Sequence, residues 1–324
     1  MTKHVSVFAT GGTIAGIAGS AIAADYKSGQ IEIDEYLERV GGLGLEAELS
    51  GRQIANIDSA DIGPQVWSEL HAAISGALAD DECDGVIVTH GTDTLEETAF
   101  LLDLTLSANK PVVVVGAMRP ADAVGYDGLR NFANAVGVAS DRDAAGRGVL
   151  VVMGDRVFAA RDVRKVRTRG TDAFKGFPRE SIGLVTPSCV EWFGAAWREN
   201  DSSQFAFPGQ LPAVPIAYIY AGMEPEALTC SLADAKGVVI AGVGEGNMPE
   251  VVRRELGRFA ASGHPVVRAS RADEGLVDRE PEDAENCFVA TRALNPQKAR
   301  ILLQLLIANG VTDPATIQTA FDER

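Results

Sequence analysis

Short apolar runs, mostly followed by small or polar residues, constrain the fold of this chain more than any other feature. Four such runs occur in the first half of the sequence, at residues 5–9, 85–89, 111–116 and 148–153. Helical patterns lie between them, for example at residues 66–78 and 94–106. Strands that alternate with helices predict an α/β fold with a doubly wound, mostly parallel sheet that is covered on both faces.

The regular pattern stops at residues 192–214, where polar residues, Gly and Pro dominate, and we interpret this segment as a linker. A second, smaller set of predicted strands follows at residues 216–220, 237–241, 265–269 and 287–290. Asn295-Pro296 and Asp313-Pro314 have the residue types of helix starts. The sequence thus predicts a larger N-terminal domain (residues 1–191) and a smaller C-terminal α/β domain (residues 215–324).

Composition and charge exclude several classes of partner. The formal net charge of −16 argues against nucleic acid or an anionic membrane, because both require a basic face. No apolar run reaches the length of a membrane span. The four cysteines are widely spaced and the histidines are not clustered, so we expect neither a metal site nor a disulfide framework.

Residues that follow the apolar runs are the first candidates for a site, because ligands of such sheets bind beyond the carboxyl ends of the strands. After the first run, Gly11 and Gly12 permit a sharp turn and present Thr13, a candidate nucleophile. The alternative is an ordinary strand–turn–helix corner. The glycine spacing does not match G-x-G-x-x-G, which argues against a dinucleotide cofactor.

Two hydroxyls and a carboxylate follow the second run, in Thr92-Asp93-Thr94. Such a strand-to-helix turn favours anionic groups through its N–H groups and the helix dipole. Alternatively, Asp93 and Thr94 only cap the helix, since Thr94 and Glu97 have capping-box spacing. Beside Thr13, however, Thr92 on an adjacent strand end could flank one small electrophile.

A threonine nucleophile requires a base. The candidates are Tyr26, in the loop ADYKSG, and Lys165, which is surrounded in sequence by Arg161, Arg164 and Arg167. Nearby positive charge favours a neutral, basic lysine. The alternatives are a surface tyrosine and a solvated basic face. His90 is a conventional base, although its place between strand and glycine equally suits a packing or hydrogen-bonding role.

With these residues identified, the chain resembles the bacterial L-asparaginases of the family that also includes the glutaminase-asparaginases. Two segments, ATGGTIAG (9–16) and VTHGTDTLEETA (88–99), are highly specific to the family. The resemblance continues through KPVVVVGAMRP (110–120), GVLVVMGD (148–155), RDVRK (161–165), AGVGEGN (241–247) and LNPQKARILLQLL (294–306). The last of these is similar to the exported type II enzymes.

The resemblance implies that Thr13 attacks the side-chain amide of L-asparagine, forming an acyl-enzyme and releasing ammonia without a metal or cofactor. It implies the catalytic residues Thr13, Tyr26, Thr92, Asp93, Lys165 and Glu280. The implied substrate-binding residues are Gly12, Ser59, Gly91, Thr92, Asp93, Ala117 and Asn247. Asn247 and Glu280 would come from a neighbouring subunit of a homotetramer built from intimate dimers.

The sequence also departs from the family pattern. Ala60 stands where the family usually has Gln or Glu to contact the substrate α-amino group, which is expected to weaken binding or shift selectivity. The segment before Glu280 is shorter than in close relatives. A dual glutaminase-asparaginase, a non-catalytic amino-acid sensor on the same scaffold and a nucleotide-binding module are the competing hypotheses.

The compartment is left open by the sequence. MTKHVSVFATGG leads directly into the first predicted strand, so no signal peptide is visible and the expectation from these residues is cytoplasmic. The likeness to type II enzymes instead suggests the periplasm, if a signal has been removed.

Overall fold

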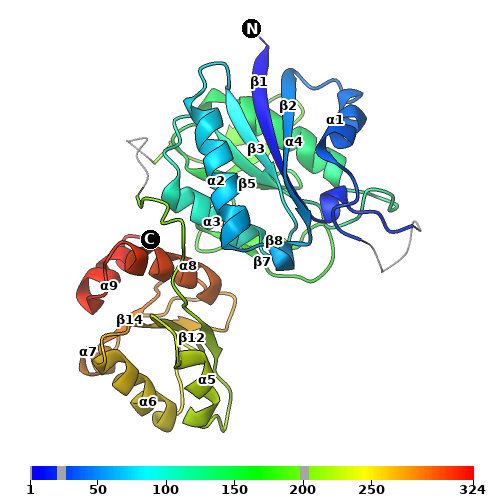
Figure 1. Cartoon of the computed structure of the whole chain (residues 1–324). Helices are drawn as coiled ribbons and strands as arrows, with labels where there is room; N and C mark the ends of the chain where they lie inside the picture. Colours follow the sequence, from blue (N-terminus) through cyan, green and yellow to red (C-terminus); the bar gives the residue numbers. More distant parts are fainter. Residues whose placement is uncertain (1, 20–26, 198–203) are drawn as a thin grey trace. The chain divides into compact units, whose positions relative to one another are not determined.

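The structure is a computed structural model that describes residues 2–19, 27–197 and 204–324 (Figure 1). The chain forms two compact units, Met1–Gln204 and Phe205–Arg324. The boundary between them falls inside the segment expected as a linker, whose first residue, Trp192, ends strand β10 (Val190–Trp192).

The N-terminal unit contains an eight-stranded sheet with the order β10-β9-β6-β5-β4-β3-β1-β2. The strands are β1 (Lys3–Gly11), β2 (Ala47–Ile57), β3 (Gly85–Thr89), β4 (Val112–Val115), β5 (Val149–Met153), β6 (Arg156–Ala159), β9 (Gly183–Val185) and β10 (Val190–Trp192). Strands β1 to β5 are parallel, and β6, β9 and β10 extend the sheet with antiparallel pairs. The predicted fold class is confirmed.

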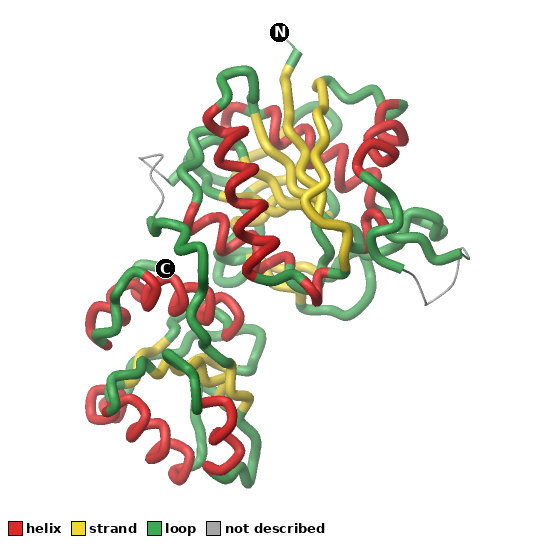
Figure 2. Tube along the Cα trace, in the orientation of Figure 1, coloured by secondary structure: helices red, strands yellow, loops and turns green. Residues whose placement is uncertain are grey.

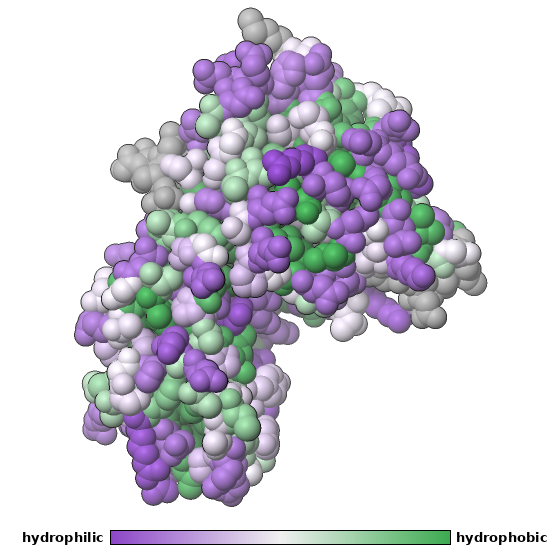
Figure 3. Space-filling view, in the orientation of Figure 1, coloured by the Kyte–Doolittle hydropathy of each residue, from purple (hydrophilic) through white to green (hydrophobic). Residues whose placement is uncertain are grey.

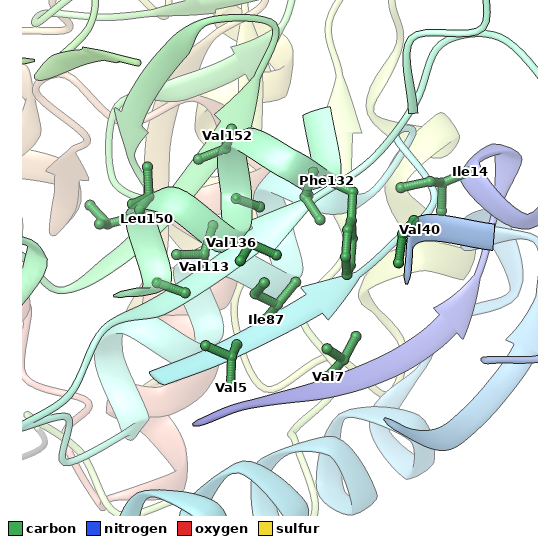
Figure 4. Packing of buried hydrophobic residues seen from close by; sticks show 14 of the residues in the cluster. Val5, Val7, Ile14, Val40, Ile87, Val113, Phe132, Val136, Leu150 and Val152 are labelled. Carbon is green, nitrogen blue, oxygen red and sulfur yellow. The ribbon is translucent and has the colours of Figure 1, made fainter. Parts of the chain in front are cut away.

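Helices cover both faces of this sheet (Figure 2). They are α1 (Ile33–Gly41), α2 (Pro64–Ala79), α3 (Leu95–Thr105) and α4 (Gly128–Ser140). Side chains alternate along β1, so that Val5 and Val7 pack with α1 and α4 in one core, whereas Phe8 packs with α2 and α3 in the other. Figure 4 shows the first of these cores.

The order in which the chain adds strands to the sheet reverses between β1 and β3. From β1 the chain first moves to its outer neighbour β2, then crosses back to β3 on the other side of β1 and continues to β4 and β5. Such a reversal opens a crevice beyond the strand ends, which is where open α/β sheets bind their ligands. The topology therefore places the crevice where Thr13 and Thr92 follow their strands.

A separate two-stranded sheet lies outside the main one. It consists of β7 (Val163–Lys165) and β8 (Phe174–Gly176), which pair antiparallel with Lys165 opposite Phe174. Lys165 therefore reaches the site from a different sheet than the two threonines.

The C-terminal unit has a parallel four-stranded sheet with the order β11-β12-β13-β14. The strands are β11 (Ile216–Tyr218), β12 (Val238–Gly242), β13 (Val266–Ser270) and β14 (Phe288–Ala290). The longer helices are α6 (Glu250–Ala261), α8 (Pro296–Ala308) and α9 (Pro314–Asp322), and the shorter ones are η4 (Pro225–Leu228), α5 (Thr229–Leu232) and α7 (Pro281–Asn286).

The predicted helix starts have different outcomes. Asn295 accepts a hydrogen bond from Lys298 N at 3.1 Å, and Asp313 accepts one from Thr316 N at 2.9 Å, so both caps are confirmed. The capping box at Thr94 is wrong, because the Thr94 hydroxyl makes no cap and donates instead to Ser59 O at 2.8 Å. A tertiary contact has replaced the local one.

On the face shown in Figure 3, hydrophilic residues surround small groups of apolar ones. Within the described part of the chain, no helix combines the length and the apolar character that crossing a membrane requires.

Candidate active site

Four neighbouring strands end at the candidate site, and each delivers one residue singled out from the sequence. Ser59 follows β2, Thr13 follows β1, Thr92 follows β3 and Ala117 follows β4, in the sheet order β4-β3-β1-β2. Parallel strands bring their carboxyl ends to one edge, so residues far apart in the sequence lie together there. The expected convergence at one edge is thus observed.

Glycines allow these strand ends to approach one another. Gly12 has a φ of +80°, and a β-carbon added to it would overlap the backbone of Gly91. A β-carbon on Gly91 would lie 2.7 Å from the Ser59 β-carbon, and one on Gly116 would lie 2.8 Å from the carbonyl oxygen of His90. The turns that carry Thr13 and Thr92 are thus in direct backbone contact, and the Ser59 side chain packs against the same Gly91, so that side chains larger than hydrogen would separate them.

Thr13 is held on a buried turn. It begins the short 3₁₀ helix η1 (Thr13–Ala15), and only 5% of its surface is exposed. Ile14 inserts into the core beside Val40 (Figure 4). The Tyr126 hydroxyl donates to Ile14 O at 2.7 Å, and burial raises the pKa of Tyr126 to about 12, so this hydroxyl keeps its proton at neutral pH. The residue after Thr13 is therefore anchored through both its side chain and its carbonyl oxygen.

Thr92, Asp93 and Lys165 form a connected group. Lys165 Nζ donates to Thr92 Oγ1 at 2.9 Å and forms an ion pair with Asp93 Oδ1. The Lys165 side chain is 15% exposed, and neighbouring Arg164 is buried. The solvated-face interpretation is therefore wrong for Lys165, which points into a polar cluster at the strand ends, whereas Arg167 of the same run is exposed.

Ser59 is coupled to this group through the backbone. Its hydroxyl oxygen accepts a hydrogen bond from Asp93 N at 3.2 Å, which leaves the hydroxyl hydrogen available for an acceptor. Asp58 caps the turn η2 (Ser59–Asp61) by accepting from Ala60 N at 3.0 Å. Ala60 itself is exposed and brings no polar side chain, as the sequence indicates.

Ala117 is buried, and its neighbours fix its backbone. The Asp127 carboxylate accepts from Met118 N and Arg119 N, both at 3.0 Å. Asn131 Nδ2 donates to Gly116 O at 2.9 Å. The segment after β4 is thus held on both sides of Ala117.

His90 serves as a structural hydrogen-bonding group. It is fully buried, and its Nδ1 lies 2.7 Å from Gly91 O, which can only accept, so Nδ1 carries the hydrogen. Nε2 then accepts from the Thr98 hydroxyl at 2.8 Å, and Thr98 accepts from Trp67 Nε1 at 2.9 Å. Burial lowers the pKa of His90 to about 4, partly offset by the Gly91 bond. Of the two roles left open for His90, this geometry favours hydrogen bonding.

Asn247 and Glu280 lie in the C-terminal unit on two loops that share one arginine. The fully buried Arg268 donates to Glu245 O and to Asp278 O, both at 3.0 Å. Burial alone would lower the pKa of Arg268, but hydrogen bonds and charge from Asp283 outweigh it and raise the pKa. Asn247 is exposed, and the Glu280 side chain is 32% exposed at the start of α7.

Tyr26 lies outside the described residues. Among the residues that the structure does describe, no group of three or more His, Cys, Asp or Glu is arranged to hold a metal ion. All four cysteines are free thiols.

Comparisons with known proteins identify the family of this chain. Residues 4–198 match the family description "Asparaginase, N-terminal", and residues 213–321 match "Glutaminase/Asparaginase C-terminal domain". The chain belongs to the asparaginase family. Members of this family are hydrolases that act on amides.

Individual relatives in the asparaginase family match nearly the whole chain. A Haemophilus influenzae protein named probable periplasmic L-asparaginase is 41% identical, over 99% of this chain and 93% of its own length. A Pseudomonas aeruginosa glutaminase-asparaginase is 37% identical, over 99% of this chain and 90% of its own length. The crystal structure of a probable cytoplasmic L-asparaginase from Campylobacter jejuni matches with a TM-score of 0.93 and 35% identity, covering 99% of this chain and 100% of that one.

Several supporting residues of this asparaginase-family site are absent from the sequence-based prediction. Glu96, Tyr126, Asp127 and Asn131 all contact backbone groups beside the predicted residues. Their partners lie in other segments or in turns, so no periodic pattern reveals them. Only Glu96 has a feature that the sequence shows, as an acidic residue in the first turn of a helix, and Glu97 has the same feature.

Gly91→Ala is expected to lower kcat/KM by about 100-fold, because the new methyl group would push the Ser59 turn away and misplace both turns. Steady-state kinetics on asparagine would measure this. Gly76→Ala, at a helical glycine with no atom within 4 Å, is the matched control and should leave kcat/KM unchanged. Equal kinetics for the two variants would contradict the close-packing argument.

The pKa of His90 predicts a loss of stability in acid. Because its folded pKa of about 4 lies below the ordinary 6.5, the unfolded chain takes up the proton first as the pH falls. The free energy of unfolding is therefore unaffected by protonation of His90 above pH 6.5, and it falls by about 3 kcal/mol as the pH is lowered toward 4. Chemical denaturation of the natural protein and of His90→Gln should therefore diverge over this range. Parallel pH dependences would refute the assignment.

Proposed function

We propose that this protein hydrolyses L-asparagine to L-aspartate and ammonia through an acyl-enzyme on Thr13. The observation that carries the proposal is the bond of 2.9 Å from Lys165 Nζ to Thr92 Oγ1, within the group that also contains Asp93. This group adjoins the Thr13 turn through the contact of Gly12 with Gly91. Relatives over nearly the full length carry the name L-asparaginase.

The proposed reaction has two stages. Thr13 Oγ1 attacks the amide carbon, its proton passes to the departing nitrogen, and ammonia leaves behind an ester on Thr13. Water then attacks the ester carbon, which releases aspartate and restores the Thr13 hydroxyl. Lys165, through the Thr92 hydroxyl, is positioned to relay protons in this process, and Asp93 holds the lysine side chain in place. Tyr26 is proposed to assist activation of Thr13.

Substrate binding is proposed to use both charged ends of the amino acid. The Ser59 hydroxyl, whose oxygen already accepts from Asp93 N, would donate to the α-carboxylate. Asp93, with a side chain that is 64% exposed, would accept from the α-amino group. Gly12, Gly91 and Ala117 would line the site through their backbones. Fixed groups at both ends orient a small substrate that offers few other contacts.

Hydrolysis of L-glutamine is the second candidate activity. It is favoured by the Pseudomonas aeruginosa relative named glutaminase-asparaginase and by Ala60, which leaves space where the family usually has a longer polar side chain. One extra methylene in a pocket changes selectivity by only about 1–3 kcal/mol. Ammonia release from the two amino acids, compared at equal concentration, decides between them.

The active assembly is proposed to be a homotetramer of intimate dimers in which Asn247 and Glu280 complete a neighbouring subunit's site. Their shared attachment to Arg268 supports this, because one buried guanidinium fixes the loops of both residues. Two polar side chains presented by a common support can act at one external site.

Thr13→Ala is expected to lower kcat by about 10⁴-fold while leaving the fold intact, because the bond-forming hydroxyl is lost. Thr13→Ser, which keeps the hydroxyl, should retain measurable turnover. Ammonia release measures both, and circular dichroism checks the fold. A Thr13→Ala variant with more than about a tenth of the natural kcat would refute the nucleophile assignment.

Co-expression of Thr13→Ala and Glu280→Ala subunits tests the shared site. Each variant alone should be nearly inactive. If each site draws on two subunits, one of the two sites in a mixed dimer combines two intact contributions. Mixed dimers should therefore recover about half of the natural activity, and a random co-expressed population about a quarter. As the control, the two variants are expressed separately and then mixed under conditions in which subunits do not exchange. No recovery in proven mixed dimers would show that each subunit's site is self-contained.

A further inference from the structure

Lys165 is carried by a short strand outside the main sheet. Strand β7 has three residues and pairs with β8 in a two-stranded sheet apart from the sheet that carries the threonines. A lysine side chain is long and flexible, so the position of its ammonium depends on where its backbone is held. The bond to Thr92 therefore requires something that ties β7 to the start of α3.

The backbone N–H of Lys165 provides that tie. The next residue, Val166, donates its N–H to Ala173 O at 2.8 Å, across the small sheet. Successive N–H groups of a strand point in opposite directions, so the N–H of Lys165 points away from β8. It donates instead to Glu96 Oε2 at 2.7 Å.

Glu96 is suited to hold this contact. It is only 6% exposed and lies in the first turn of α3, where a negative charge is favoured by the helix dipole. A carboxylate acceptor also makes a stronger hydrogen bond than a neutral one. Glu96 follows Asp93 by three residues, so one short segment contacts Lys165 at both ends, through Glu96 at the backbone and through Thr92 and Asp93 at Nζ.

We infer that Glu96 is a positioning residue for the reaction, which sets the reach of Lys165 toward Thr92 by holding the Lys165 backbone. This inference rests on the proposed function of the Thr92–Asp93–Lys165 group. Glu96 does not itself contact the substrate. Its loss is therefore expected to reduce turnover more than substrate binding, because the substrate contacts of Ser59 do not depend on it.

Three variants separate position from charge. Glu96→Gln keeps the length and an acceptor oxygen, and should retain most of the natural kcat. Glu96→Leu removes the acceptor and should lower kcat by about 10–100-fold, with KM for asparagine changed less than about threefold. Glu96→Asp keeps the charge but withdraws the carboxylate, so its kcat should fall below that of Glu96→Gln. Glu97→Gln, which removes a charge from the same helical turn, is the matched control and should keep the natural kcat.

Kinetics are measured well below the thermal unfolding transition of each variant, so that lost stability is not mistaken for lost turnover. A Glu96→Leu enzyme with more than about half the natural kcat would overturn the inference. If Glu96→Leu does not fold, the order of the other two decides, and a higher kcat for Glu96→Asp than for Glu96→Gln would overturn it. If instead the natural protein releases no ammonia from asparagine or glutamine, the proposed function itself has failed.

Discussion

The contact between the backbones of Gly12 and Gly91 is the constraint on which the rest of the site depends. Thr13 and Thr92 belong to turns after two adjacent parallel strands, and strand spacing alone would leave room for side chains between those turns. Because neither glycine carries a β-carbon, the turns meet directly, and Ser59 packs against the same glycine from β2. The position of the site follows from the strand order, whereas the close approach of its turns follows from these glycines.

Support for the polar groups comes from segments that are otherwise separate. The main sheet places the threonines, and the small β7–β8 sheet brings Lys165. Side-chain-to-backbone bonds join them, from Glu96 to Lys165, from Tyr126 to Ile14 and from Asp127 to the segment beside Ala117. Each bond holds a main-chain atom next to a proposed functional residue. The geometry of the cluster is therefore set by the backbone.

The fold class and the two threonine turns follow from the sequence, because apolar runs and glycines report directly on buried strands and tight turns. Grouping Lys165 with Thr92 and Asp93 required the family resemblance, since 72 residues separate Lys165 from Asp93 and the local run of arginines favours a solvated surface. At Thr94, by contrast, the local pattern predicts a contact that the structure does not contain. Its spacing to Glu97 matches a local cap, yet its hydroxyl bonds to Ser59 O, a partner 35 residues away. Local patterns thus fail where a long-range polar partner competes for the same atom.

Ser59 and Asp93 are coupled in a way that matters for recognising an amino acid. The Asp93 N–H donates to the Ser59 hydroxyl, which polarises that hydroxyl as a donor toward an incoming carboxylate. The Asp93 side chain is held by Lys165 and faces solvent. In the proposed function, groups for the two ends of a zwitterion are therefore joined by one hydrogen bond. A shift of either turn would therefore disturb the contacts to both ends of the substrate together.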